Sequence, residues 1–182
     1  MVYLGNNASS NKMIEKILSV LTSKKYWAGL LIIAMAMESG ALFYQYVLDY
    51  YPCVLCIHVR IITLGIMIVS LLALYFHKQI KLTITFHIIN TAMLTLLLER
   101  SYQLLGVERG FVTGDCSMNS GLPSWFAVDQ WLPWLFKIWE PCGYTPELLL
   151  GVTMAEALIV LSPVLLLISI IVTVTLLFRR SN

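Results

Sequence analysis

Residues 50–60 read YYPCVLCIHVR and lead directly into a long apolar run. Because proline cannot continue a preceding helix, a new helix is expected to begin just after Pro52. Cys53 and Cys56 then stand at its N-terminus, and Arg60 follows one turn later on the same face as Cys56. The stretch predicts a helix that enters a nonpolar environment with two cysteines at its entrance and a cation one turn inside.

The chain as a whole has the composition of a membrane protein. Hydrophobic residues make up 59% of its 182 residues and charged residues only 12%, outside the range of ordinary soluble domains. Four segments can each cross a hydrocarbon core of about 30 Å as helices, and only helices satisfy such backbones in lipid. The predicted spans are residues 26–48, 54–76, 82–98 and 157–178. We expect an all-α membrane protein, a four-transmembrane-helix bundle over residues 26–178 that follows a cytoplasmic segment, 1–25.

Polar residues within the spans are expected to face the interior of the bundle. The third span contains several threonines together with His87 and Asn90, and span one contains Glu38. Counted along the helices, Glu38 lies about 15 Å below the outer end and Arg60 about 6 Å below it. We therefore expect Glu38 to hydrogen-bond Asn90 or the threonines of span three, and not to pair with Arg60.

The distribution of basic residues sets the orientation. Eight of the twelve lie beside the ends of spans that would meet on one side: Lys12, Lys16, Lys24, Lys25, Lys78, Lys81, Arg179 and Arg180. This side is predicted to be cytoplasmic, with both termini on it. Loops 49–53 and 99–156 then face outward. No basic stripe remains that would bind a nucleic acid.

All four cysteines fall on the predicted outer side: Cys53, Cys56, Cys116 and Cys142. Four thiols on an oxidising face favour disulfide chemistry, although three connectivities are open. A zinc site is disfavoured because Cys116 and Cys142 are too far apart to form a second short knuckle. Two purely structural disulfides are the plain alternative, but the small loop between Cys53 and Cys56 would gain little stability from a bridge.

A redox function agrees best with the position of the first cysteine pair. The partial positive charge at a helix N-terminus favours a thiolate, which is the nucleophilic form of cysteine. Arg60, one turn beyond Cys56, would favour it further. The plain alternative for Arg60 is an anchor whose charged end reaches the membrane surface.

Four stretches resemble one family, the DsbB-type disulfide bond formation proteins of bacterial inner membranes. They read MESGALFYQYVL (37–48), PCVLCIHVR (52–60), GDC (114–116) and LPSWFAVDQWLPWLFKIWEPC (122–142). The resemblance covers nearly the whole chain from residue 25 onward. It implies a four-helix bundle that reoxidises a periplasmic thioredoxin-like oxidase of the DsbA type and passes electrons to a membrane quinone, ubiquinone or menaquinone.

The resemblance also implies roles for individual residues. Cys116 would form the mixed disulfide with the partner, and Cys142 would be its disulfide mate. Cys53 and Cys56 would be the second pair, with Cys56 next to the quinone and Arg60 beside a quinone carbonyl.

The sequence departs from the family near the outer end of span three. Members tend to have a histidine there, close to the quinone, whereas this chain reads LERSYQLLG from residue 98. Arg100, or else Gln103, would have to replace that histidine in binding quinone. A polar residue common in the family just before Arg60 is also replaced, by Val59.

The long outer loop contains a segment rich in tryptophan. Residues 125–139 are strongly apolar and aromatic, as expected of a short helix lying in the membrane interface, and Pro133 is expected to kink or begin it. An aromatic belt without a catalytic role is the alternative. The glycine-containing stretch before Cys116 is expected to be flexible enough to enter a partner's groove.

Two other classes of protein compete with this interpretation. Enzymes of the vitamin K epoxide reductase type also combine a C-x-x-C motif with quinone chemistry, but they place the motif near the last helix. A membrane scaffold or small transporter with stabilising disulfides would have bridges that resist a mild dithiol and do not depend on quinone.

Overall fold

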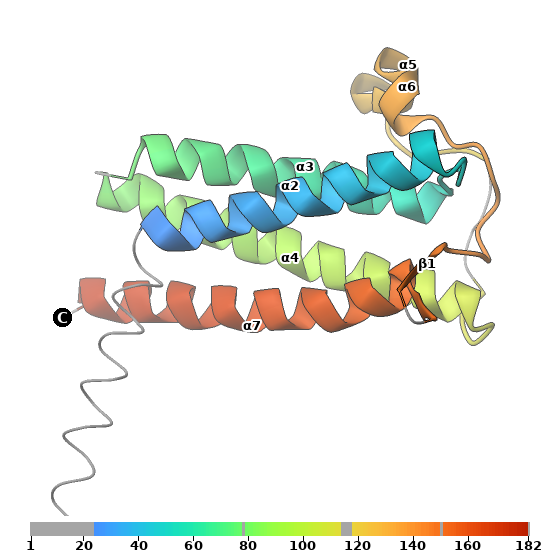
Figure 1. The fold of residues 1–182 in the computed structure, drawn as a ribbon. Helices are drawn as coiled ribbons and strands as arrows, with labels where there is room; N and C mark the ends of the chain where they lie inside the picture. The colour runs from blue at the N-terminus through green and yellow to red at the C-terminus, as the bar shows by residue number, and fades with distance from the viewer. Residues whose placement is uncertain (1–23, 78, 114–117, 150, 182) are drawn as a thin grey trace, which may run out of the picture.

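Four long helices lying side by side dominate the structure (Figure 1). The computed structural model describes residues 24–77, 79–113, 118–149 and 151–181, so most of the predicted cytoplasmic segment is outside it. The bounds are α2 (Lys24–Val47), α3 (Val54–Tyr75), α4 (Ile80–Glu108) and α7 (Met154–Ser181). Each helix is long and apolar enough to cross a membrane. The prediction of an all-α, four-helix membrane bundle is confirmed.

The helices pack in series, α2 against α3, α3 against α4, and α4 against α7. Buried apolar side chains fill these contacts, among them Trp27, Leu30, Ile57, Ile66, Leu94, Leu97 and Val172. The outward faces are also apolar, as at Ile32, Leu71 and Leu167, which suits a surface that meets lipid tails. Helices α2 and α7 stand at the two ends of this series.

Polar side chains join the helices in the half of the bundle away from the cysteines. Asn90 is fully buried and donates to the Tyr26 hydroxyl and to Ser169 Oγ, each at 3.2 Å. His87 is also fully buried and packs against the rings of Tyr26 and Trp27. The prediction that polar residues of the third span face the bundle interior is confirmed for His87 and Asn90, whereas Thr85 and Thr95 are exposed and donate to carbonyls of their own helix. Hydrogen bonds between polar side chains commonly join neighbouring helices inside a membrane.

Helix α4 extends ten residues beyond position 98, where the predicted third span ended. The extension begins with polar residues, which is why the span was predicted to stop there. These residues bond to one another along the helix: Gln103 donates to Glu99 at 2.8 Å, and Arg100 donates to Gln103 at 3.0 Å. Side chains three and four apart are neighbours on a helix, so they support it beyond the apolar span.

The aromatic part of the long loop forms three short helical turns and not the single interfacial helix expected. They are η1 (Ser124–Phe126), α5 (Val128–Trp131) and α6 (Pro133–Phe136), at the end of the bundle beside α2 and α3 (Figure 1). Pro133 has no N–H to bond the preceding turn, so α5 stops and α6 begins at the proline. Pro133 therefore begins a helix, one of the two expected outcomes.

A small hairpin precedes the last helix. Strands β1 (Glu147–Leu149) and β2 (Val152–Thr153) pair antiparallel, and β2 leads directly into α7. Strands of two or three residues are too short to show alternation, so the sequence pattern did not predict them.

Candidate functional site

Cys53 and Cys56 lie together where α3 begins. Cys53 is the N-cap, and its Sγ accepts a hydrogen bond from the Cys56 N–H at 3.3 Å. The two Sγ atoms are 2.7 Å apart, and Cys53 is only 2% exposed. The i to i+3 spacing at a helix start therefore places both sulfurs at one point, and a disulfide between them can form or open with little movement of the backbone.

Cys142 reaches the same point from the long loop. Its thiol lies within hydrogen-bonding reach of Cys53, although 89 residues separate the two along the chain. The backbone holds it there, because the Trp139 N–H donates to the Pro52 carbonyl at 3.1 Å. Cys53 and Cys56 both carry free thiols. Cys116, the fourth of the cysteines predicted to be catalytic, lies outside the described residues.

The neighbours of Cys53 hold it in the thiol form. Cys142 lowers the pKa of Cys53, but the hydrogen bond with Cys56 and burial raise it by more, so the net direction is upward. A buried thiol between two other sulfurs thus tends to keep its proton, and Cys53 is placed to receive attack more than to make it.

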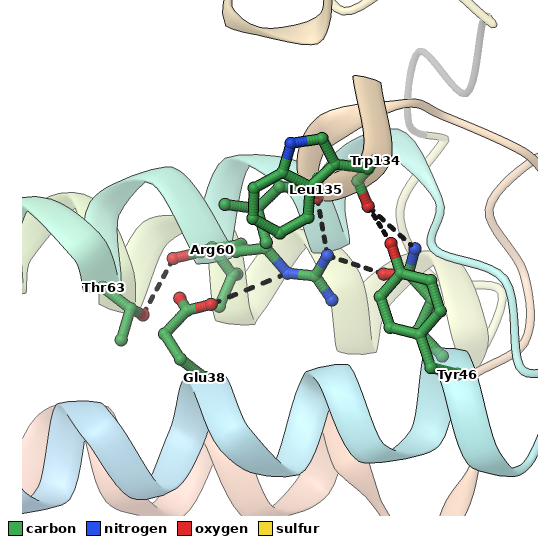
Figure 2. Close-up of polar contacts among 8 residues, drawn as sticks. Glu38, Tyr46, Arg60, Thr63, Trp134 and Leu135 are labelled. Atoms are coloured by element: carbon green, nitrogen blue, oxygen red, sulfur yellow. Dashed lines mark hydrogen bonds and ion pairs between the residues drawn. The ribbon is translucent and has the colours of Figure 1, made fainter. Parts of the chain in front are cut away.

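Arg60 is buried inside the cysteine end of the bundle. Its Nη1 donates to Gln45 Oε1 and to the Leu135 carbonyl, each at 2.7 Å (Figure 2). Its Nε lies 3.7 Å from Glu38 Oε2. The guanidinium therefore joins α3 to α2 through two side chains, and to the loop through a carbonyl of α6.

The pairing of Glu38 with Arg60 overturns the expectation that Glu38 would bond Asn90 or the threonines of span three. Helix α2 ends at Val47 and α3 begins at Val54, so the two residues lie nine and six positions from these ends. At 1.5 Å per residue their depths differ by about 5 Å, which two long side chains can bridge. The sequence estimate placed Arg60 too close to the outer end of its helix, and so it overstated the gap between the two side chains.

A cavity of about 430 Å³ opens beside Cys56 and Arg60. It lies between α2 and α7, the two helices at the ends of the packing series, with α3 as its back wall. Most of its lining is apolar, including Ile33, Ala36, Met37, Gly40, Ala41, Val59, Leu104, Leu158 and Leu161. Its polar side chains include Cys56, Arg60 and Glu38. The site thus combines a mainly apolar cavity with one thiol and one cation.

Tyrosines and the hairpin close the cavity at the cysteine end. Tyr44 donates to the carbonyls of Glu147 and Leu148 at 3.1 and 3.3 Å, which holds the hairpin over α2. The rings of Tyr50 and Tyr144 stack at 6.2 Å between centroids. All three tyrosines line the cavity. Sequence analysis missed them because tyrosine near a membrane surface is common and gives no specific signal.

The family comparison covers this site and all four long helices. A family model described as "Disulfide bond formation protein DsbB" matches residues 23–172. The chain belongs to the DsbB family. The matched region includes every cysteine, Arg60, and the lining of the cavity.

Individual DsbB-family relatives carry the name "Disulfide bond formation protein B". One from Aeromonas salmonicida (strain A449) is 29% identical over 172 residues, which are 89% of this chain and 94% of that protein. One from Shewanella frigidimarina (strain NCIMB 400) is 32% identical over 133 residues, 71% of this chain and 78% of the other. One from Psychromonas ingrahamii (strain DSM 17664 / CCUG 51855 / 37) is 31% identical over 145 residues, 76% of each chain. As a DsbB-family member, the protein is a multi-pass membrane oxidoreductase that forms disulfide bonds.

Arg100, which the sequence offered as a quinone-binding residue, is not brought to the cavity of this DsbB-family chain. It donates to Gln103 and lies 3.7 Å from Glu99 on α4, partly exposed. Neither Arg100 nor Gln103 is among the residues that line the cavity. The geometry lends no support to a role for either in binding quinone.

Gln45 is a site residue that sequence analysis did not single out. Its side chain is 7% exposed. Its Oε1 accepts a hydrogen bond from Arg60, and its Nε2 donates one to the Trp134 carbonyl at 3.5 Å. Gln45 is seven residues after Glu38, two helical turns, and so lies on the same face of α2. That spacing of two polar residues in an apolar helix was the available signal.

Proposed function

We propose that this protein is a thiol:quinone oxidoreductase. It would reoxidise a periplasmic thioredoxin-like dithiol oxidase of the DsbA type and pass two electrons through its cysteines to a membrane quinone. The observation that carries the proposal is that Cys56 and Arg60 share one apolar cavity, while Cys142 lies beside Cys53, whose Sγ is 2.7 Å from that of Cys56.

The cavity has the properties that a lipid-soluble acceptor requires. It lies between membrane-spanning helices, its walls are mainly apolar, and one end presents a thiol and a cation. A quinone ring would be held with Cys56 against the ring and Arg60 donating to a carbonyl oxygen. A bound quinone supplies a two-electron acceptor that no side chain of the protein provides.

The sulfur positions support a direct route from the loop to the helix pair. Attack by a partner thiolate on Cys116 of a Cys116–Cys142 disulfide would release Cys142 as a thiolate. Cys142 would then attack Cys53, forming the Cys53–Cys142 bond, breaking the Cys53–Cys56 bond and releasing the Cys56 thiolate. Exchange of this kind leaves the number of electrons unchanged, and it transfers the reducing equivalents to Cys56, the sulfur that faces the cavity. The Arg60 charge nearby favours that thiolate.

The direction of the bundle follows from the same proposal. The cysteine end would face the periplasm, where the oxidising environment keeps disulfides formed. Lys24 and Lys25 begin α2 at the opposite end of the bundle, where basic residues favour the cytoplasm. The protein would thus lie in the bacterial inner membrane with both termini cytoplasmic.

Purified protein tests the proposal when it is mixed with a reduced DsbA-type oxidase and a soluble quinone while quinone absorbance is followed. The wild-type protein should consume quinone, and each Cys→Ser variant at 53, 56, 116 or 142 should lose turnover. Undiminished quinone consumption by Cys56→Ser would overturn the mechanism. If the disulfides resist a mild dithiol and no quinone is consumed, the protein is a scaffold or transporter instead.

A further inference from the structure

The guanidinium of Arg60 holds the loop that carries Cys142. Its bond to the Leu135 carbonyl links α3 to a segment 75 residues further along the chain. This carbonyl and that of Trp134 belong to the last turn of α6, where backbone acceptors have no partner within the helix. The Trp134 carbonyl accepts instead from Tyr46 and Gln45 (Figure 2).

The same bonds position Cys142. Leu135 is seven residues before Cys142, and between them the Trp139 N–H donates to the Pro52 carbonyl, next to Cys53. Phe136 and Ile138 are 4% and 8% exposed, so this segment also buries apolar side chains against the bundle. Two hydrogen bonds therefore hold residues 134–142 against the bundle, one at Leu135 and one at Trp139, and we call the segment seated when it is held in this way. Arg60 makes the bond at Leu135, which lies deeper in the bundle.

Arg60 also faces the cavity. Its planar guanidinium has five N–H donors in a fixed arrangement. In the described part of the chain, Nη1 donates to Gln45 and to Leu135, and Nε faces Glu38. Nη2 is then the donor that remains for an acceptor in the cavity, which Arg60 lines. Because the group is rigid, Gln45 and Leu135 set the direction in which Nη2 points.

We propose that Arg60 couples the cavity to the loop, with Gln45 as the positioning residue that aligns the guanidinium for both. An acceptor that binds Nη2 stabilises the orientation in which Nη1 holds Leu135, and so it stabilises the seated loop with Cys142 beside Cys53. Such coupling is reciprocal, so the seated loop also strengthens binding in the cavity. The proposal deepens the proposed function, on which it rests, because the acceptor is taken to be a quinone carbonyl.

Amide hydrogen exchange of residues 134–139 measures seating directly. The protein is used with Cys53 and Cys56 changed to serine, so that it neither transfers electrons nor bridges Cys142. Decylubiquinone should slow exchange of this segment by about fivefold or more, the lower range of common coupling. Gln45→Leu should remove this slowing, and Gln45→Glu, which keeps an acceptor for Nη1, should retain it. Arg60→Lys should lose it despite keeping the charge, because a lysine cannot bind both sides at once.

Tyr46→Phe is the matched control. It removes one bond to the Trp134 carbonyl without touching Arg60, so exchange should be faster throughout while decylubiquinone slows it by the same factor as in the parent. An equal effect of decylubiquinone in the Gln45→Leu protein and its parent would overturn the coupling, as would no effect in a parent shown by equilibrium dialysis to bind it. Wild-type protein that consumes no quinone would instead refute the proposed function itself.

Discussion

Glu38 on α2 and Arg60 on α3 form an ion pair in the interior of the bundle. Glu38 Oε2 lies 3.7 Å from Arg60 Nε, and the two side chains are 9% and 4% exposed. Taking two charges out of water is costly, so the pair persists because Gln45 and the Leu135 carbonyl satisfy further donors of Arg60. The arrangement keeps a cation at the wall of an apolar cavity.

Removing the carboxylate should destabilise the protein, because Arg60 then remains as a buried charge without its partner. We expect Glu38→Ala to lower the free energy of unfolding by about 3 kcal/mol, and Glu38→Gln by less. Thermal unfolding in detergent measures this. Glu99→Gln is the control, since the exposed Glu99–Arg100 pair should contribute less than about 1 kcal/mol. Equal losses in Glu38→Ala and Glu99→Gln would contradict the structural importance of the buried pair.

Filling the cavity should impair quinone use without harming the fold. Gly40 lines the cavity, and a Cβ added there meets no atom within 4 Å. Gly40→Leu should raise the KM for quinone about tenfold or more while unfolding is unchanged, since a leucine occupies space that a ring needs. Gly29→Leu is a matched control on α2, open in the same way but outside the cavity lining. An unchanged KM in Gly40→Leu would remove this cavity as the quinone site.

The sulfur geometry predicts which mixed pair forms between loop and bundle. In Cys56→Ser, a Cys53–Cys142 disulfide should accumulate in a glutathione redox buffer, because Cys142 lies within hydrogen-bonding reach of Cys53. In Cys53→Ser, a Cys56–Cys142 bridge should be several-fold rarer. Peptide mapping by mass spectrometry under non-reducing conditions distinguishes them. Similar yields in both variants would show that Cys142 has no preferred partner.

The raised pKa of Cys53 predicts a pH profile. In the reduced protein Cys53 should remain a thiol through neutral pH, because Cys56 and burial outweigh the opposing influence of Cys142. Alkylation by iodoacetamide needs the thiolate, so its rate at Cys53 should keep rising above pH about 8.5, where an ordinary thiol is half ionised. The same cysteine in unfolded protein is the control. A plateau near neutral pH in the folded protein would contradict the upward shift.

Local patterns were sufficient for the elements that carry the site. Spans are read from apolar length, and the proline before Cys53 marks the start of α3, because both signals depend only on residues adjacent in the chain. Arg60 could be placed one turn inside that helix for the same reason. The extension of α4 was missed because its supporting bonds join polar side chains that resemble the end of a span.

The sequence by itself determined a four-helix membrane protein with a C-x-x-C motif at a helix N-terminus and an arginine one turn below it. Only the tertiary structure decided that Cys142 lies beside Cys53, that Glu38 pairs with Arg60, and that Arg60 holds Leu135. These contacts depend on how helices end and cross and on where a long loop folds back. Periodicity records which face of a helix is apolar, but not which distant residue will meet it.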